Sequence, residues 1–157
     1  ENKKILVCGN GGSAADSQHL AAEWICRYAP DRKTLPAIAL VANTSVVTAI
    51  ANDYGFEKVF SRQIEALAQT GDVLIAITTS GKSKNVLAAL DQAKLQGIKT
   101  IILTGESGAG LKGRADIVLA VPSAETARVQ EMHELIYHIW CEYIDSHILE
   151  NSANIKQ

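Results

Sequence analysis

Five short apolar segments alternate along the chain with segments of helical character, and this alternation constrains the fold more than any other feature. The apolar segments are rich in β-branched residues and bounded by turn residues, as is typical of buried strands; they span 4–8, 37–41, 72–78, 99–104 and 117–121. The expected helices span 13–28, 45–52, 57–68, 84–96 and 126–150. Strands that alternate with helices form parallel sheets covered on both faces. The sequence therefore predicts an α/β fold with a five-stranded parallel sheet.

Composition excludes several classes of protein. The 157 residues include 15 Lys and Arg against 17 Asp and Glu, a net charge of −2 that is scattered along the chain. This leaves no basic surface for nucleic acid or an anionic membrane, and no apolar run approaches the roughly 18 residues that span a bilayer. The three cysteines, an odd number without a CxxC pair, argue against disulfides and for a reducing cytoplasm. We expect one domain over 1–150 and a tail at 151–157 that frays.

The last expected helix carries more apolar surface than one sheet face needs. Its main stripe repeats in steps of three and four residues and consists of Val129, Met132, Ile136, Ile139 and Tyr143. Two interpretations remain open for this stripe. Either the helix packs against another subunit, or it folds back on its own sheet.

A glycine-rich loop at 9–14, GNGGSA, separates the first strand from the first helix. It matches the dinucleotide fingerprint G-x-G-x-x-G/A, which also needs a carboxylate at the end of the second strand to hold the ribose. The second strand ends in LVAN at 40–43, without a carboxylate. A nicotinamide or flavin cofactor is therefore disfavoured. A phosphate or sugar at the helix N-terminus is preferred, with a structural turn as the alternative.

A second loop at 76–83, AITTSGKS, resembles a P-loop but has Ala76 in place of its first glycine. No later strand ends in the Asp that orients magnesium in triphosphate sites. The hydroxyl groups around Gly81 instead favour a phosphate monoester, against the alternative in which Ser83 is an ordinary N-cap. These hydroxyl-bearing residues are Thr78, Thr79, Ser80 and Ser83.

Two helices carry titratable residues that point to a catalytic site. His19 and Glu23 stand four residues apart and share a helix face, with Arg27 one turn further along. The last helix adds three candidates, Gln130, His133 and His138. Glu134 and Glu142 offer His138 an equally simple exposed ion pair. The residues alone therefore predict an α/β domain that binds a phosphate ligand and has a His/Glu site nearby.

Four ordered blocks extend this interpretation over nearly the whole chain: CGNGGSAADSQHLAAE at 8–23, AIANDYGFEKVFSRQ at 49–63, TTSGKS at 78–83 and TARVQEMHELIYHIWCEYID at 126–145. Together they resemble the phosphosugar isomerase (SIS) domain of the phosphoheptose isomerases. The resemblance implies a flavodoxin-like three-layer fold, a homotetramer with active sites between subunits, and cytoplasmic enzymes of bacterial surface glycan synthesis such as that of lipopolysaccharide. It also implies an additional N-terminal helical segment, which we expect to be absent because the chain opens almost directly in a strand.

The resemblance assigns a role to each matching residue. The catalytic base matches Glu23 and the partner acid matches His138. The zinc ligands of metal-bearing members match His19, Glu23, Gln130 and His138. Phosphate and sugar contacts match Asn10, Gly11, Gly12, Ser13, Arg27, Asn52, Asp53, Thr78, Thr79, Ser80, Ser83 and Gln130. Gln130 and His138 are eight positions apart, about 12 Å along an ideal helix, so one ion reaches both only if their side chains lean together or the helix begins irregularly. Otherwise the two serve different subunits.

The implied reaction interconverts sedoheptulose 7-phosphate and D-glycero-D-manno-heptose 7-phosphate through an enediol. A base moves a proton between carbons and an acid moves a proton between O1 and O2, while zinc either polarises these oxygens or fixes the geometry. Two alternatives remain: a non-catalytic tetramer that binds the bacterial replication initiator, and a phosphosugar-sensing module. Members of the initiator-binding group lack the histidine that matches His138, which favours the enzyme.

Overall fold

A computed structural model of the chain describes residues 3–154, with side chains through Glu150. Its sheet has five parallel strands in the order β2-β1-β3-β4-β5. The strands are β1 (Ile5–Gly9), β2 (Ala37–Ala39), β3 (Val73–Thr78), β4 (Lys99–Gly105) and β5 (Ile117–Val121). This order is that of flavodoxin-like folds, in which the chain reverses its direction of winding between β1 and β3. The five-stranded parallel α/β sheet predicted from the sequence is confirmed.

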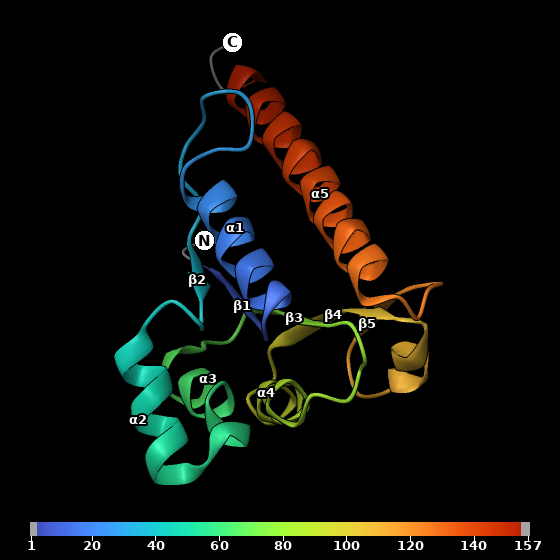
Figure 1. The fold of residues 1–157 in the computed structure, drawn as a ribbon. Coiled ribbons are helices and arrows are strands. Elements are labelled where there is room, and N and C mark those ends of the chain that lie inside the picture. The colour runs from blue at the N-terminus through green and yellow to red at the C-terminus, as the bar shows by residue number, and fades with distance from the viewer. Residues whose placement is uncertain (1–2, 155–157) are drawn as a thin grey trace.

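Helices cover both faces of the sheet and make three layers (Figure 1). One face carries α1 (Gly12–Ile25) and α5 (Thr126–Asn154), and the other carries α2 (Thr44–Tyr54), α3 (Ser61–Leu67) and α4 (Lys84–Leu95). Two short 3₁₀ helices, η1 (Phe56–Lys58) and η2 (Glu106–Leu111), complete the elements. None of the helices in the described part of the chain is both long and apolar enough to cross a membrane.

The core consists of two apolar layers because neighbouring residues of a strand point to opposite faces. In β1, Ile5 and Val7 pack in the layer beneath α1 and α5, whereas Leu6 and Cys8 pack in the layer beneath α2, α3 and α4. Strand β3 alternates in the same way. Both faces of the central strands are therefore buried, which explains why these strands read as continuous apolar runs.

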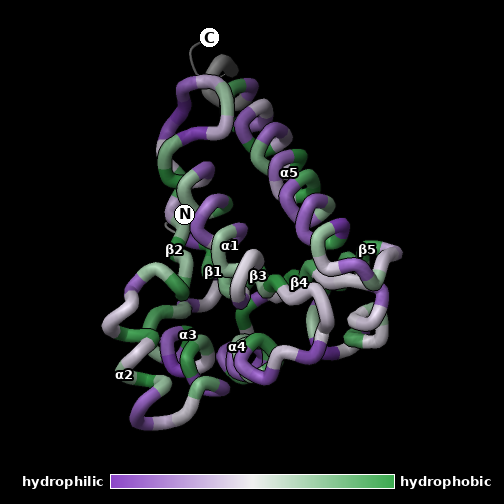
Figure 2. The backbone as a smooth tube through the Cα atoms, viewed as in Figure 1, coloured by the Kyte–Doolittle hydropathy of each residue, from purple (hydrophilic) through white to green (hydrophobic). Residues whose placement is uncertain are grey.

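Helix α5 has one buried and one exposed face, and Figure 2 shows apolar and polar residues alternating along it. Its buried face advances in steps of four residues: Val129, His133, Tyr137, Cys141 and Asp145. Of the predicted stripe, Val129 is buried, whereas Met132, Ile139 and Tyr143 are exposed. The helix therefore does fold back on its own sheet, but through residues other than most of the stripe. The exposed apolar residues stay available to another subunit.

Several expected element boundaries were wrong; β2, for example, ends at Ala39 instead of 41. Helix α1 ends at Ile25 instead of 28, the helix expected over 57–68 is divided into η1 and α3, and α5 continues past Glu150 to Asn154. Residues 155–157 of the tail expected to fray lie outside the described residues. The early end of α1 has a clear cause: the N–H groups of Tyr28 and Ala29 donate to the Asp145 carboxylate instead of continuing the helix.

Candidate active site

A pocket of about 330 Å³ lies at the carboxyl ends of β1 and β3. Neighbouring strands whose connections leave in opposite directions open a crevice there, which is where open α/β sheets bind ligands. Both loops singled out in the sequence line it, together with the start of α5. The lining residues are Asn10, Gly11, Gly12, Ser13, Ile77, Thr78, Thr79, Ser83, Thr126 and Gln130. Eight of the predicted substrate-binding residues thus come together in one chain, and Thr126 joins them unforeseen.

Three helices begin at this pocket: α1 at Gly12, α4 at Lys84 and α5 at Thr126. Helix N-termini carry unpaired N–H groups and a partial positive charge, so together they favour an anion. Ser83 precedes α4 but makes no capping hydrogen bond; its hydroxyl lies 3.1 Å from that of Thr78. The arrangement favours a ligand-binding role for these hydroxyls over the structural turn.

The glycine loop after β1 is shaped by close contacts. Gly11 has a φ of 57°, a backbone conformation that side chains disfavour. A Cβ on Gly12 would lie 2.2 Å from the side-chain amide nitrogen of Gln130, so a larger residue would displace the Gln130 side chain from its place beside the loop. Asn10 is held by Asn85, which the sequence reasoning missed, through two side-chain hydrogen bonds of 2.9 and 2.8 Å. The pocket floor is therefore fixed before any ligand binds.

His19 is the centre of a second cluster, between α1 and α5. Its Nε2 lies 3.2 Å from Glu23 Oε1, and its Nδ1 lies 3.0 Å from the hydroxyl of Tyr137 and 3.6 Å from Glu134 Oε1. The ring of His138 meets the His19 ring edge to face at 5.0 Å between centroids. The pair Glu23 and His138, predicted from helices far apart in sequence, thus converges on one imidazole.

Chemically, this cluster suits a metal ion. Donor atoms of His19, Glu134 and His138 all lie within 4.8 Å of one another, and Nε2 of His138 is buried without a hydrogen-bond partner. Imidazole and carboxylate ligands are those that zinc prefers in catalytic sites. Of the predicted ligands, Gln130 instead lines the pocket, two turns before His138 on α5. Glu134, halfway between them, had been considered only as an exposed partner of His138.

Asp16 joins this cluster from α1 and was also missed. Its Oδ2 is buried without a partner. Burial, helped by the charge of Glu134, raises its pKa to about 6. The folded chain therefore keeps this carboxyl protonated up to a pH about two units higher than the unfolded chain does. Ionising it above that pH costs folding free energy.

We expect Asp16→Asn to stabilise the metal-free protein at pH 7–8 by about 1–2 kcal/mol, a value reduced for partial exposure of the group. The gain should shrink as pH falls from 6 to 4, because the wild-type carboxyl is then protonated in both folded and unfolded states. Urea unfolding with chelator present, at several pH values, measures it. Asp31→Asn, at an exposed position, serves as the control. A gain that does not depend on pH would contradict this assignment.

His133 and the remaining predicted ligand contacts lie elsewhere in this chain. His133 is buried, and burial lowers its pKa while one ring nitrogen lies 3.2 Å from the carbonyl oxygen of Thr104. Asn52 and Asp53 bond to each other on exposed α2, Arg27 donates to the carbonyl of Ala29, and Ser80 accepts from the N–H of Lys82. Arg27, Asn52, Asp53 and Ser80 do not line the pocket of this chain. Their roles stay predictions.

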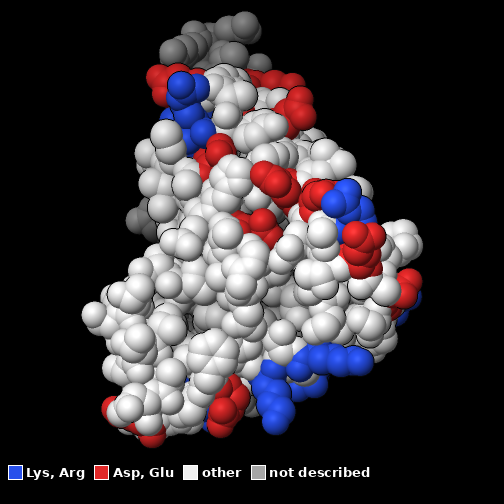
Figure 3. All heavy atoms as spheres, in the orientation of Figure 1, with Lys and Arg blue, Asp and Glu red and all other residues white. Residues whose placement is uncertain are grey.

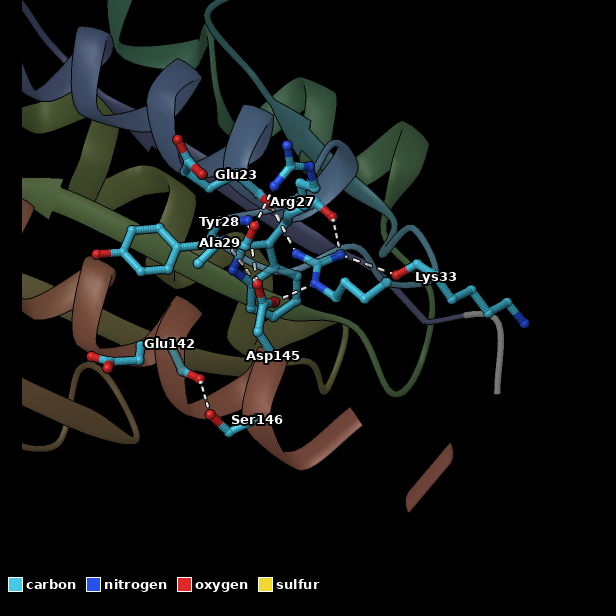
Figure 4. Close-up of polar contacts among 10 residues, drawn as sticks. Glu23, Arg27, Tyr28, Ala29, Lys33, Glu142, Asp145 and Ser146 are labelled. Atoms are coloured by element: carbon cyan, nitrogen blue, oxygen red, sulfur yellow. Dashed lines mark hydrogen bonds and ion pairs between the residues drawn. The ribbon is translucent and has the colours of Figure 1, made fainter. Parts of the chain in front are cut away.

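A buried ion pair fixes the end of α1 that carries Glu23 (Figure 4). The side chains of Arg32 and Asp145 are both 1% exposed, and Arg32 Nε donates to the carboxylate. The same guanidinium donates to the backbone carbonyls of Glu23 and Trp24, in the last turn of α1. Asp145 thus holds the loop after α1, while Arg32 caps α1 itself.

The charged surface is divided. Figure 3 shows many acidic residues over α1 and α5, with some basic groups among them, and a strip of basic residues over the region of α4. The rim nearest the His19 cluster is therefore acidic, as suits a cation. The pocket at the ends of β1 and β3 offers an anion hydroxyl groups and helix N-termini instead.

The chain is similar in sequence and in structure to known proteins. A family model described as SIS domain matches residues 1–105. The phosphoheptose isomerase of a Nitratiruptor species is 59% identical over 143 residues, 91% of this chain and 76% of that protein. That of Helicobacter pylori (strain Shi470) is 56% identical over 92% of this chain and 75% of its own. The structure of phosphoheptose isomerase GmhA from Neisseria gonorrhoeae has 48% identity and a TM-score of 0.85, with 92% and 77% covered.

Proposed function

The chain belongs to the phosphoheptose isomerases of the SIS-domain family, and from this premise we propose that its pocket and His19 cluster interconvert sedoheptulose 7-phosphate and D-glycero-D-manno-heptose 7-phosphate. The observation that carries the proposal is the convergence of Glu23 and His138 on His19, beside a pocket built for a phosphate. The resemblance seen in the four sequence blocks is confirmed at the level of the family.

Phosphate binding comes first in the proposed mechanism. The hydroxyls of Ser13, Thr78 and Ser83 and the N-termini of α1, α4 and α5 surround the pocket. A bound phosphate monoester accepts hydrogen bonds from these groups, which are stronger to a charged acceptor. The sugar chain then extends from the pocket along α1 and α5 toward the His19 cluster.

Glu23 is the proposed base. Its carboxylate removes a proton from C1 of the open-chain ketose and returns it to C2 on the same face, so the hydrogen migrates through an enediol. His138 moves the accompanying proton between O1 and O2. The Glu23 side chain is 21% exposed, which leaves it open to substrate but largely screened from water.

His19, Glu134 and His138 are the residues that fit a zinc ion in this chain, with Glu23 and Gln130 the further ligands that the family resemblance implies. When bound, zinc would supply a positive charge that stabilises negative charge on the substrate oxygens. The orphaned Nε2 of His138 supports this proposal.

Assembly and cellular context are also proposals. A homotetramer with active sites between subunits would cover the exposed apolar residues Met132, Leu135, Ile139 and Tyr143 of α5. It would also explain why Arg27, Asn52 and Asp53 lie away from the pocket of their own chain, since a neighbouring subunit is then free to use them. The free cysteines fit a cytoplasmic enzyme. Its aldoheptose product would serve surface glycan synthesis such as that of lipopolysaccharide.

Incubation of the purified protein with sedoheptulose 7-phosphate and zinc, followed by chromatography of the products, tests the function. We expect aldoheptose 7-phosphate to form to equilibrium. Sedoheptulose without phosphate should react at least roughly a hundredfold less efficiently, because it forfeits charged hydrogen bonds of about 1.5–3 kcal/mol each. Failure to convert the phosphorylated sugar would instead favour a non-catalytic binding module. The convergence of Glu23 and His138 argues against that alternative.

A further inference from the structure

Tyr137 occupies an unusual place for a phenol. It lies on α5 immediately before His138 and is completely buried in the apolar layer beneath α1 and α5. A buried hydroxyl requires a hydrogen-bond partner. Its partner is His19, whose Nδ1 lies 3.0 Å from the Tyr137 oxygen. The buried Tyr137 side chain thus places its hydroxyl oxygen next to Nδ1 of the His19 ring.

The surroundings of this hydroxyl keep it protonated. Burial, followed by the nearby carboxylates of Asp16 and Glu134, raises the pKa of Tyr137 well above its ordinary value. A protonated phenol accepts one hydrogen bond while donating another. Asp16 Oδ2 is buried without a hydrogen-bond partner and its charge acts on this phenol, so it is the acceptor that the phenol proton would need to reach.

The contact has a consequence for the other nitrogen of His19. A neutral imidazole carries its proton on one nitrogen, and a metal binds the nitrogen that lacks it. The nitrogen away from Tyr137, Nε2, faces Glu23 Oε1 at 3.2 Å. If the Nδ1 proton is donated to the phenol oxygen, Nε2 is unprotonated and open to a cation that it would share with the Glu23 carboxylate, whereas a proton on Nε2 would be donated to Glu23 instead.

We infer that Tyr137 is a positioning residue for His19: its hydroxyl accepts the Nδ1 proton and so presents an unprotonated Nε2 to a divalent cation. This inference rests on the proposed function, since it assigns the residue behind one of the proposed zinc ligands. Partners of this kind fix the ring orientation and tautomer of ligating histidines, and their loss typically lowers metal affinity about 10–100-fold.

Tyr137→Phe removes the hydroxyl and leaves the buried ring, so the fold should persist. We expect zinc affinity, measured by competition with a chromophoric chelator, to fall about 10–100-fold. Nitrogen-15 NMR of the zinc-loaded wild type should show the His19 proton on Nδ1, and the variant should lose that fixed signature. Tyr143→Phe, at a 72% exposed tyrosine of the same helix, should keep the wild-type affinity.

The outcomes separate this inference from the proposed function. Unchanged zinc affinity in Tyr137→Phe would overturn the inference while leaving the isomerase intact. A proton on Nε2 of His19 in the zinc-loaded wild type would overturn it without any variant. A wild-type protein that isomerises sedoheptulose 7-phosphate but binds no zinc would also overturn it, whereas loss of the proposed function would appear as absent turnover of that substrate.

Discussion

Glu23→Gln is expected to fold normally and to lose turnover of sedoheptulose 7-phosphate by several orders of magnitude. Gln has the same shape and keeps an oxygen that can lie near Nε2 of His19, where Glu23 Oε1 now lies at 3.2 Å. It cannot take a proton from carbon at neutral pH, and a positioned general base contributes about 10²–10⁴-fold to a rate. The proposed phosphate pocket is lined by other residues, so KM should change little while kcat falls.

Two measurements make this prediction sharp. Steady-state kinetics should show the loss in kcat, and exchange of solvent deuterium into the sugar should disappear in parallel, because both require proton removal by the same group. Glu142→Gln, on an exposed position of α5, is the matched control and should keep both rates. Near-normal turnover in Glu23→Gln would reject Glu23 as the base.

The sheet could be predicted from local sequence because its signals are local. Continuous β-branched runs mark strands that are buried on both faces, and the range 72–78 expected for the third strand agrees to within one residue with β3 (Val73–Thr78), which is buried beyond its first residue. The end of α1 could not be predicted in this way. It depends on Asp145, which lies 117 positions after Tyr28 and accepts its N–H. No local pattern near residue 28 announces that partner.

In the candidate site, too, residues with a local sequence signal could be predicted and residues that depend on packing between helices could not. His19 and Glu23 were found because their spacing of four residues places them on one helix face. Tyr137 and Asp16 were missed because their roles arise only when α5 packs against α1, and each looks ordinary in its own helix. A signal for Glu134 did exist: it stands four residues from both Gln130 and His138, on the face that joins the two clusters.

The second large effect concerns stability. Asp145→Asn should lower the free energy of unfolding by about 3–5 kcal/mol, because it leaves the Arg32 guanidinium buried without its counter-charge. Both side chains are 1% exposed, so water cannot replace the lost partner. Urea denaturation near neutral pH measures the change. Because the pair fixes the backbone of Glu23 and the loop at Tyr28, whose ring lies 5.2 Å from that of His138, kcat should fall as well.

The chain contains its own control for this prediction. Arg114 and Asp91 form an ion pair with the same residue types and two hydrogen bonds, but their side chains are 41% and 54% exposed. Solvent screening limits such pairs to about 0–1 kcal/mol, so Asp91→Asn should change stability little and turnover not at all. Equal losses from the two variants would show that burial is not what gives the Arg32–Asp145 pair its importance. A loss confined to Asp145→Asn would show that the end of α1 that carries Glu23 is held by a contact with a residue far along the chain.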